Sequence, residues 1–147
     1  MRYLYRMLLN DVYQDDKEFL EEFCLTNKLQ IGRSVKGLNI SSEIELNFRG
    51  KYFYLHEFPG NCSSLIISHI QDHLYGDESI PLGFIEIIKD FCIKCGYGCI
   101  FISLTDNFII EKMINYGFKK VWRIWNPHSE SLNTFLALEV NNESKTA

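Results

Sequence analysis

The chain has 147 residues, 46% of them hydrophobic, so it can form one domain with a substantial core, and a disordered chain is excluded. Its formal net charge of −4, with both signs interspersed, argues against the clustered basic surface on which nucleic-acid affinity depends. No apolar run reaches the roughly 18 residues that a membrane-spanning helix needs. We therefore predict a single domain over residues 1–140 and a flexible polar tail over residues 141–147.

The N-terminal residues are basic and apolar, but Arg6 interrupts the run and no small-residue cleavage site follows it. A secretory signal is therefore not predicted, and we expect a cytoplasmic protein whose residues 3–9 form a first β-strand. The cysteines number five, and an odd count without a signal argues against a disulfide framework.

Asp15 and Asp16 predict the cap of a helix over residues 17–26, where apolar side chains recur on one helical face. Residues 27–37 are expected to be irregular or to hold a short second helix. Three β-prone runs follow, separated by turns rich in Gly, Pro and Asn, and this pattern predicts an antiparallel meander. The runs cover residues 40–48, 52–58 and 64–70.

The second half of the chain alternates helix and strand. After a polar loop over residues 71–80, Ser79 is the expected N-cap of the next helix, with Pro81 in its first turn. The expected elements are helix 82–95, strand 99–104, helix 107–116 and strands 120–125 and 134–140. We therefore predict an α/β fold, or α+β in the looser sense. Its sheet is mixed, mostly antiparallel and twisted, with about six to seven strands and with helices on both faces.

One local stretch and the order of the elements resemble a known family. Asp106 opens a helix that ends in Gly117 and Phe118, which resembles the fourth-helix signature of the GNAT superfamily of acyl-CoA-dependent N-acyltransferases. The helix that stops at Gly96 and the strand over residues 99–104 look like the third helix and fifth strand of that family. The resemblance extends over residues 40–140 and implies transfer of an acetyl group from acetyl-CoA to an amine.

The family resemblance also indicates where the cofactor would bind. In GNAT proteins, backbone N–H groups of a glycine-containing loop wrap the diphosphate at the start of the third helix. Here Ser79 and Pro81 stand at the glycine positions of that loop, and Asp77 and Glu78 add negative charge. The cofactor-binding residues that the resemblance implies are Ile70, Gly76, Ser79, Ile80 and Asn107, the last of these through the pantetheine arm.

Two residues are candidates for the base that takes a proton from the acceptor amine. His69 ends the third meander strand, with His73 four residues further on, and the pKa of histidine suits proton transfer near neutral pH. Glu57 lies beside His56 in the second meander strand, with the two on opposite faces, and could act through a water molecule. The alternative for each residue is an ordinary solvated position on a strand or in a loop.

Other motifs have plainer interpretations. Cys92 and Cys95 form a CxxC motif on the apolar face of a predicted helix, so we expect them in the core. Thr105 or Asp106 is expected to cap the following helix. Many GNAT proteins carry in their fourth helix a tyrosine that protonates the leaving thiolate, and Met113 stands at that position here.

Two functions from different classes remain open. The first is a divergent GNAT-like N-acetyltransferase that acts on an amine of unknown identity. The second is a non-catalytic protein of the same fold that binds another protein or has a structural role, and the altered loop and missing tyrosine favour it. Frequent Ile, Asn and Lys with scarce Ala are typical of an AT-rich genome, for instance that of a phage. The sequence leaves the substrate and the oligomeric state undetermined.

Overall fold

The computed structural model describes residues 2–8, 13–35, 43–58, 61–69, 80–127 and 131–140. Within these ranges the helices are α1 (Leu4–Leu8), α2 (Gln14–Thr26), α3 (Leu82–Cys95) and α4 (Asn107–Tyr116). The strands are β1 (Gln30–Val35), β2 (Glu43–Phe48), β3 (Lys51–Phe58), β4 (Asn61–His69), β5 (Cys99–Leu104), β6 (Lys119–Asn126) and β7 (Ser131–Glu139). No helix in these ranges has both the length and the apolarity required to cross a membrane.

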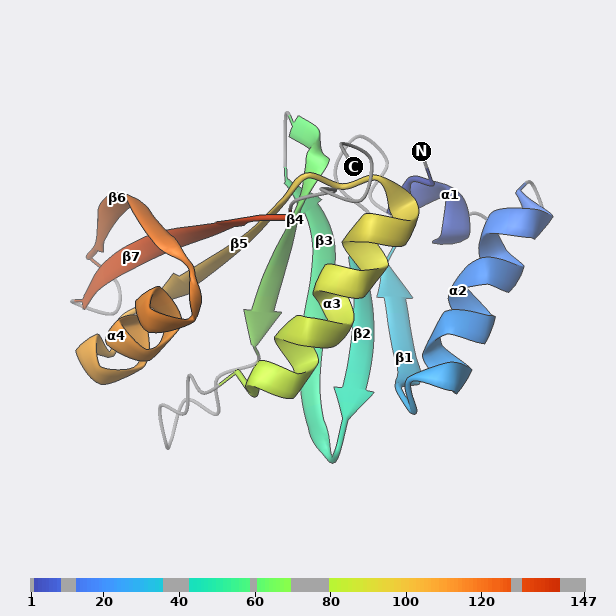
Figure 1. Ribbon diagram of the computed structural model, residues 1–147, viewed down its shortest axis with the longest axis horizontal. Helices are drawn as coiled ribbons and strands as arrows, with labels where there is room; N and C mark the ends of the chain where they lie inside the picture. The colour runs from blue at the N-terminus through green and yellow to red at the C-terminus, as the bar shows by residue number, and fades with distance from the viewer. Residues whose placement is uncertain are drawn as a thin grey trace, which may run out of the picture.

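The strands form one sheet of seven in the order β1-β2-β3-β4-β5-β7-β6 (Figure 1). Neighbouring strands are antiparallel except β4 and β5, which are parallel. A parallel pair cannot be joined by a tight turn, and here α3 lies in the crossover between the two strands. The predicted class, a mixed and mostly antiparallel sheet in an α/β fold, is confirmed.

The elements between residues 82 and 116 have the predicted bounds because local signals mark their ends. Gly96 follows α3 with a φ of 97°, a left-handed conformation that favours glycine. Asp106 caps α4, since its carboxylate accepts bonds from the N–H groups of Phe108 at 2.8 Å and Ile109 at 3.3 Å. The expected capping of this helix is confirmed for Asp106.

The prediction of a strand over residues 3–9 was wrong, because residues 4–8 form α1. Leu4, Met7 and Leu8 are spaced i, i+3 and i+4, and all three side chains are buried. The N–H of Leu4 donates to the hydroxyl of Tyr97 at 2.6 Å. That contact joins residues far apart in the chain, so a short amphipathic run alone does not reveal it.

The expectation of irregular or helical structure over residues 27–37 was also wrong, because β1 occupies residues 30–35. β1 lies at one edge of the sheet, antiparallel to β2, and the register of this pair shifts between Ile31 and Ser34. A short edge strand that contains a glycine and a bulge shows little alternation of apolar and polar residues.

Two helix starts differ from expectation. Helix α2 begins at Gln14, so Asp15 and Asp16 lie in its first turn, where their charge suits the helix dipole, and neither is the cap. Pro81 occupies the N-cap position of α3 with extended backbone angles, so it precedes the first turn. Ser79, the expected cap, lies outside the described residues.

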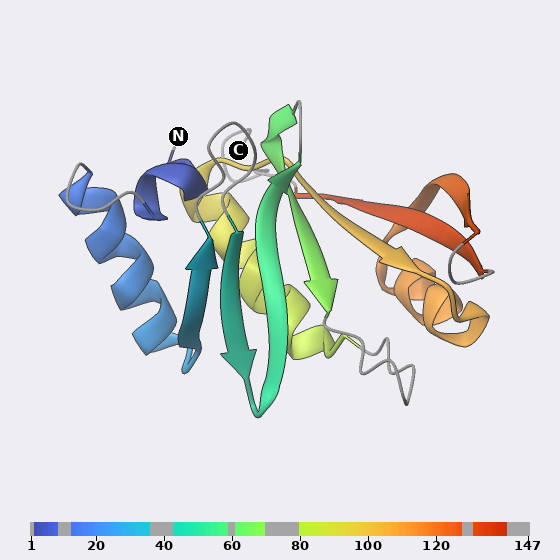
Figure 2. The same cartoon turned by 180° about the vertical axis from the view of Figure 1, so that it is seen from behind.

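The sheet has one face covered by the described helices. Along β2 every second side chain is buried, namely Ile44, Leu46 and Phe48. On this face the ring of Phe84 in α3 stacks on Phe53 in β3, with centroids 4.4 Å apart. Figure 2 shows the other face, where the strands lie in front of α3. Helices on both faces were expected, but those described lie on one, which is why burial alternates with period two.

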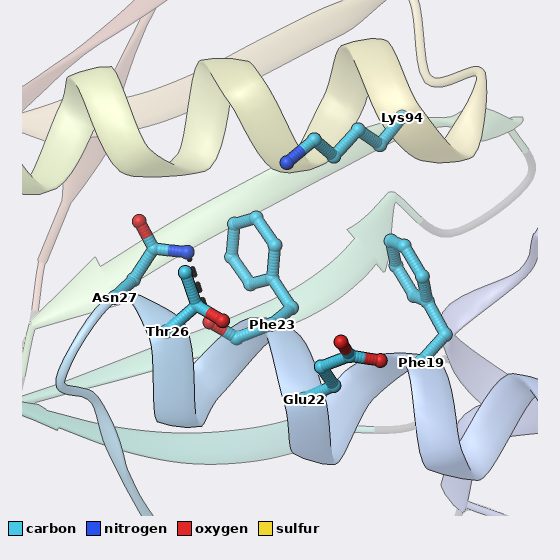
Figure 3. A pocket seen from close by; sticks show the side chains of 6 residues that line it. All are labelled: Phe19, Glu22, Phe23, Thr26, Asn27 and Lys94. Carbon is cyan, nitrogen blue, oxygen red and sulfur yellow. Dashed lines mark hydrogen bonds between the residues drawn. The ribbon is translucent and has the colours of Figure 1, made fainter.

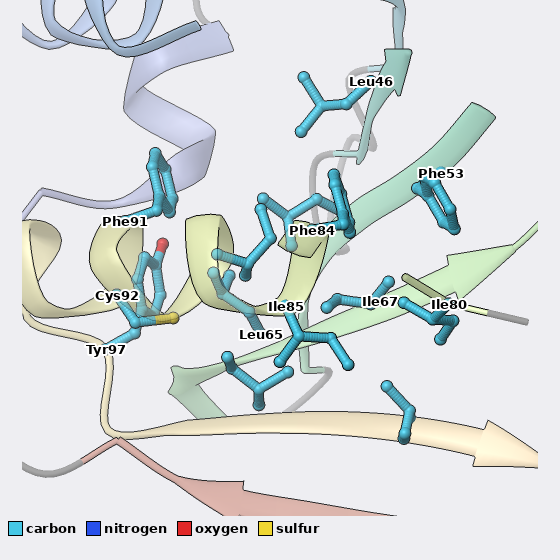
Figure 4. Close-up of a cluster of buried hydrophobic side chains, with 14 of the residues drawn as sticks. Leu46, Phe53, Leu65, Ile67, Ile80, Phe84, Ile85, Phe91, Cys92 and Tyr97 are labelled. Carbon is cyan, nitrogen blue, oxygen red and sulfur yellow. The ribbon is translucent and has the colours of Figure 1, made fainter. Parts of the chain in front are cut away.

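The core lies between this covered face and the helices (Figure 4). Helix α2 packs on α3 through Phe23 and Phe91, whose ring centroids are 5.2 Å apart. Cys92 and Cys95 are both buried, as predicted. Burial raises the pKa of Cys95 to about 12, so its thiol is protonated and unreactive at neutral pH.

Candidate functional site

Strands β4 and β5 run side by side for only part of their length. Their parallel ladder ends with Ile67 opposite Ile102. Beyond this pair, β4 continues to His69 against β3, while β5 continues to Leu104 against β7. Figure 2 shows the two strands diverging toward their carboxyl ends. In open sheets with parallel strands, ligands bind outside the carboxyl ends, so this divergence is the candidate site.

The start of α3 provides backbone donors on the β4 side of the divergence. The N–H groups of Phe84 and Ile85 bond to the carbonyl of Pro81, which leaves those of Leu82 and Gly83 without helical acceptors. Among the described residues, no side chain caps this helix, and its first turn contains no acidic residue. An uncapped helix start of this kind can bind an anion.

A histidine and a serine contact each other on the open face of the sheet, beside the divergence. Nε2 of His56 lies 3.2 Å from Oγ of Ser68, the first residue of β4 beyond its last pair with β5. Burial lowers the pKa of His56 below its ordinary value, and the charge of Glu43, opposite it in β2, only partly offsets this. His56 is therefore neutral near pH 7 and able to accept a proton.

Glu57, one of the two predicted bases, lies on the covered face under α1. Its side chain is 3% exposed, and Oε1 accepts a bond from the N–H of Tyr5 at 3.0 Å. Its Oε2 is buried and has no hydrogen-bond partner among the described residues. Burial raises the pKa of Glu57, and its interactions with Tyr5 and Tyr97 only partly lower it. Glu57 is thus not solvated. It also lies away from the divergence, because it pairs with Leu65 of β4, which is still paired with β5.

Glu57→Gln is expected to flatten the pH dependence of stability and to keep or raise stability at pH 7. Because the folded-state pKa of Glu57 is raised, its carboxyl favours folding most at pH values below its unfolded pKa of about 4.3. That contribution is lost as pH rises through the higher folded pKa. Gln keeps the acceptor for Tyr5 without the charge. Urea unfolding at several pH values measures the effect, and the exposed Glu111→Gln is the control. A pH slope that survives in Glu57→Gln would contradict this assignment.

The other predicted site residues have different surroundings. The side chain of Ile80 is buried beside Ile67, so it belongs to the core (Figure 4). Asn107 is exposed at the first position of α4. His69 is the last residue of β4, and its side chain is not described. Ile70, Gly76 and Ser79 lie outside the described residues.

Two residues of α4 are relevant to the acid that would protonate a leaving thiolate, and neither is available for that role. Met113 is buried, at the position where GNAT proteins often have a tyrosine. The hydroxyl of Tyr116 donates to the carboxylate of Glu86 in α3, and burial together with this carboxylate raises the pKa of Tyr116. Tyr116 is therefore committed to the contact between α3 and α4.

A pocket of about 250 Å³ lies between α2 and α3 (Figure 3). Lys94 lies there with Nζ 5.5 Å from the centre of the Phe23 ring and 3.0 Å from a carboxylate oxygen of Asp90. The side-chain amide of Asn27 donates to the carbonyl of Phe23 at 2.9 Å. The contact of Lys94 with the Phe23 ring joins the two helices, and the other two contacts lie within α3 and at the end of α2. We therefore assign this pocket a role in helix packing, not in function.

Comparisons with known proteins bear on the fold. No protein-family model matches the sequence, and no curated protein matches it. Among solved structures, an N-acetyltransferase of Staphylococcus aureus Mu50 has a TM-score of 0.50 and 11% identity over 86% of this chain and 77% of that one.

Two further solved structures have lower scores. A GNAT-family acetyltransferase of Streptococcus pneumoniae has a TM-score of 0.47 and 6% identity, over 90% of this chain and 79% of that chain. A Salmonella typhimurium structure that contains its cofactor acetyl-CoA has a TM-score of 0.48 and 12% identity, over 87% of this chain and 74% of that chain. At 11% identity, the likeness to the Staphylococcus aureus N-acetyltransferase shows a shared fold.

Proposed function

We propose that the chain is a divergent N-acyltransferase that transfers an acetyl group from acetyl-CoA to an amine acceptor. The observation that carries this proposal is the divergence of β4 and β5 after Ile67 and Ile102, beside the start of α3, which no described side chain caps. The shared fold supports it. Fold alone does not establish function, so the residues around the divergence must supply the chemistry.

The described residues fit an acyl-CoA in two respects. The N–H groups of Leu82 and Gly83 would hold its diphosphate, and the space between the diverging strands would hold its pantetheine arm. Pro81 contributes no N–H, so the donor set is smaller than in the family. Asp77 and Glu78 lie outside the described residues. When bound, acetyl-CoA supplies an acetyl group activated as a thioester.

His56 is the residue that we propose as the base. The acceptor amine attacks a carbonyl only in its neutral form, so a proton must leave it, and the neutral imidazole of His56 accepts that proton. Ser68 can relay it, since its hydroxyl lies within hydrogen-bond distance of Nε2. The competing candidate for the base is His69, which ends the strand that contains Ser68. The bond from the acetyl carbon to sulfur breaks as the amide bond forms, and coenzyme A would leave as a thiolate. We assign no residue as its acid, because Met113 and Tyr116 are both committed elsewhere, so the thiolate would take its proton from water.

Acetyl-CoA is expected to stabilise the folded protein. At a concentration 100 times its dissociation constant, a ligand of the folded state adds about 2.7 kcal/mol to the free energy of unfolding. Thermal unfolding with and without millimolar acetyl-CoA measures this. Free pantetheine, which lacks the nucleotide and its diphosphate, should give a much smaller shift.

Gly83→Glu tests where the diphosphate lies. Gly83 is exposed, and an added Cβ would meet only the ring of Phe48 at 3.6 Å, so a side chain is tolerated. An acidic residue in the first turn favours the helix by about 0.3–1 kcal/mol but repels a bound diphosphate. Compared with Gly83→Gln, Gly83→Glu should be equally or more stable and bind acetyl-CoA about tenfold more weakly. Equal affinities of the two variants would remove this helix start from the site.

The non-catalytic protein of the same fold is the second candidate. Met113 favours it, because the residue that often serves as the acid in this fold is replaced by a buried apolar side chain. It predicts that millimolar acetyl-CoA leaves the thermal unfolding unchanged.

A further inference from the structure

A second pocket, of about 480 Å³, lies at the carboxyl end of β5. It is bounded by the first turns of α4 and by the helix-facing side of β6 and β7. Its lining residues are Thr105, Asn107, Ile110, Lys120, Arg123, Leu132 and Thr134. This volume is within the range of small-molecule sites, and the mixture of an apolar wall with several polar groups is typical of them.

The charge of this pocket is positive. Lys120 and Arg123 line it, and neither forms an ion pair with any residue in the described ranges. The described lining contains no carboxylate. The neighbouring Asp106 is engaged in capping, since it accepts bonds from the N–H groups of Phe108 and Ile109. Two cationic side chains without an internal partner favour an anionic ligand.

A threonine adds a hydroxyl group to the polar lining of the pocket. Thr134 is 4% exposed, lines the pocket, and stands between Leu104 of β5 and Arg123 of β6 in the sheet. The hydroxyl of a threonine can both donate and accept a hydrogen bond, so Thr134 can contribute to binding an oxygen of a ligand in the pocket.

We propose that this pocket binds the acidic group, carboxylate or phosphate, of the acyl acceptor, and hence that the acceptor is a small amine that also carries an acid. The identification of the ligand as the acyl acceptor rests on the proposed function, whereas the anion site in the pocket does not depend on it. The start of α3 lies on the β4 side of the divergence, because Phe84 contacts Phe48 of β2 and Phe53 of β3. The pocket lies on the β5–β7–β6 side. Cofactor and acceptor would therefore reach the divergence from opposite sides.

Titration with inorganic phosphate, followed by NMR of the backbone amides, tests the pocket without any cofactor. We expect saturable chemical-shift changes at Thr105, Asn107 and Thr134. In the double variant Lys120→Gln/Arg123→Gln, the dissociation constant for phosphate should be at least about tenfold higher. Lys119→Gln is the matched control, because Lys119 is adjacent but pairs with Ala137 and does not line the pocket. Shifts that do not saturate, that sodium chloride reproduces, or that survive in the double variant would overturn the pocket as an anion site.

Acetyl transfer to 2-aminoethyl phosphate, compared with ethanolamine, tests the acceptor class. We expect the phosphate-bearing amine to be preferred at least tenfold, and the preference to be lost in the double variant while its affinity for acetyl-CoA is unchanged. Equal use of both amines overturns the acceptor assignment. Weaker acetyl-CoA binding by the double variant also overturns it, because the anion would then be a phosphate of the cofactor. If acetyl-CoA does not bind at all, the proposed function fails, and the phosphate titration still decides whether the pocket binds anions.

Discussion

Replacing His56 by alanine is expected to lower kcat/KM for acetyl transfer by about 10²–10⁴-fold, the usual contribution of a positioned general base. Nε2 of His56 lies 3.2 Å from Oγ of Ser68, beside the point where β4 leaves β5. Without the imidazole, the proton of the acceptor amine has no described acceptor there. Ser68→Ala should have a smaller effect, because the base would remain and only its relay would be lost.

The pH dependence distinguishes a base from a merely structural residue. Burial lowers the pKa of His56 below its ordinary value of 6.5. A base acts when deprotonated, so its contribution is present above the pKa and is lost as pH falls through it. We therefore expect an acid limb in kcat/KM at a pH below 6.5, which disappears in His56→Ala. If the limb persists there and disappears instead in His69→Ala, the base is His69.

Replacing Phe84 by alanine is expected to lower the free energy of unfolding by about 3–5 kcal/mol, as for other large aromatic residues in protein cores. Phe84 is fully buried in the first turns of α3, 4.4 Å from the ring of Phe53 and 5.5 Å from that of Phe48. These contacts anchor the start of α3 to β2 and β3. Urea or guanidinium unfolding gives the value directly.

Phe84→Leu is the matched control for this substitution, because it keeps an apolar side chain of similar reach. Leu is smaller than Phe and leaves part of the site empty, so its loss should be smaller than that of Phe84→Ala, while exchanges that conserve volume usually cost less than about 1.5 kcal/mol. A loss below that value in Phe84→Ala would mean that α3 is not anchored through this residue. The position of its N–H groups at the divergence of β4 and β5 would then need another explanation.

The candidate site was only partly predictable from the sequence. Strands β4 and β5, whose ladder ends at Ile67 and Ile102, were both predicted from the sequence. His56 was noted only as the neighbour of Glu57, on the opposite face. The contact between His56 and Ser68 joins two strands, so nothing within either strand identifies it. Glu57 was considered as a base, whereas the structure buries it under α1.

Local signals in the sequence are sufficient for the segment from α3 to α4. Helix α3 ends at Gly96, which has a positive φ, and α4 begins after the capping Asp106. Both signals act through hydrogen bonds between residues that are near neighbours in the chain. Only the tertiary structure decided that residues 4–8 are helical, that residues 30–35 pair as an edge strand, and that the described helices share one face. It also formed the cationic pocket beside Thr134. Each of these depends on contacts between residues distant in the chain, which local patterns of polarity do not encode.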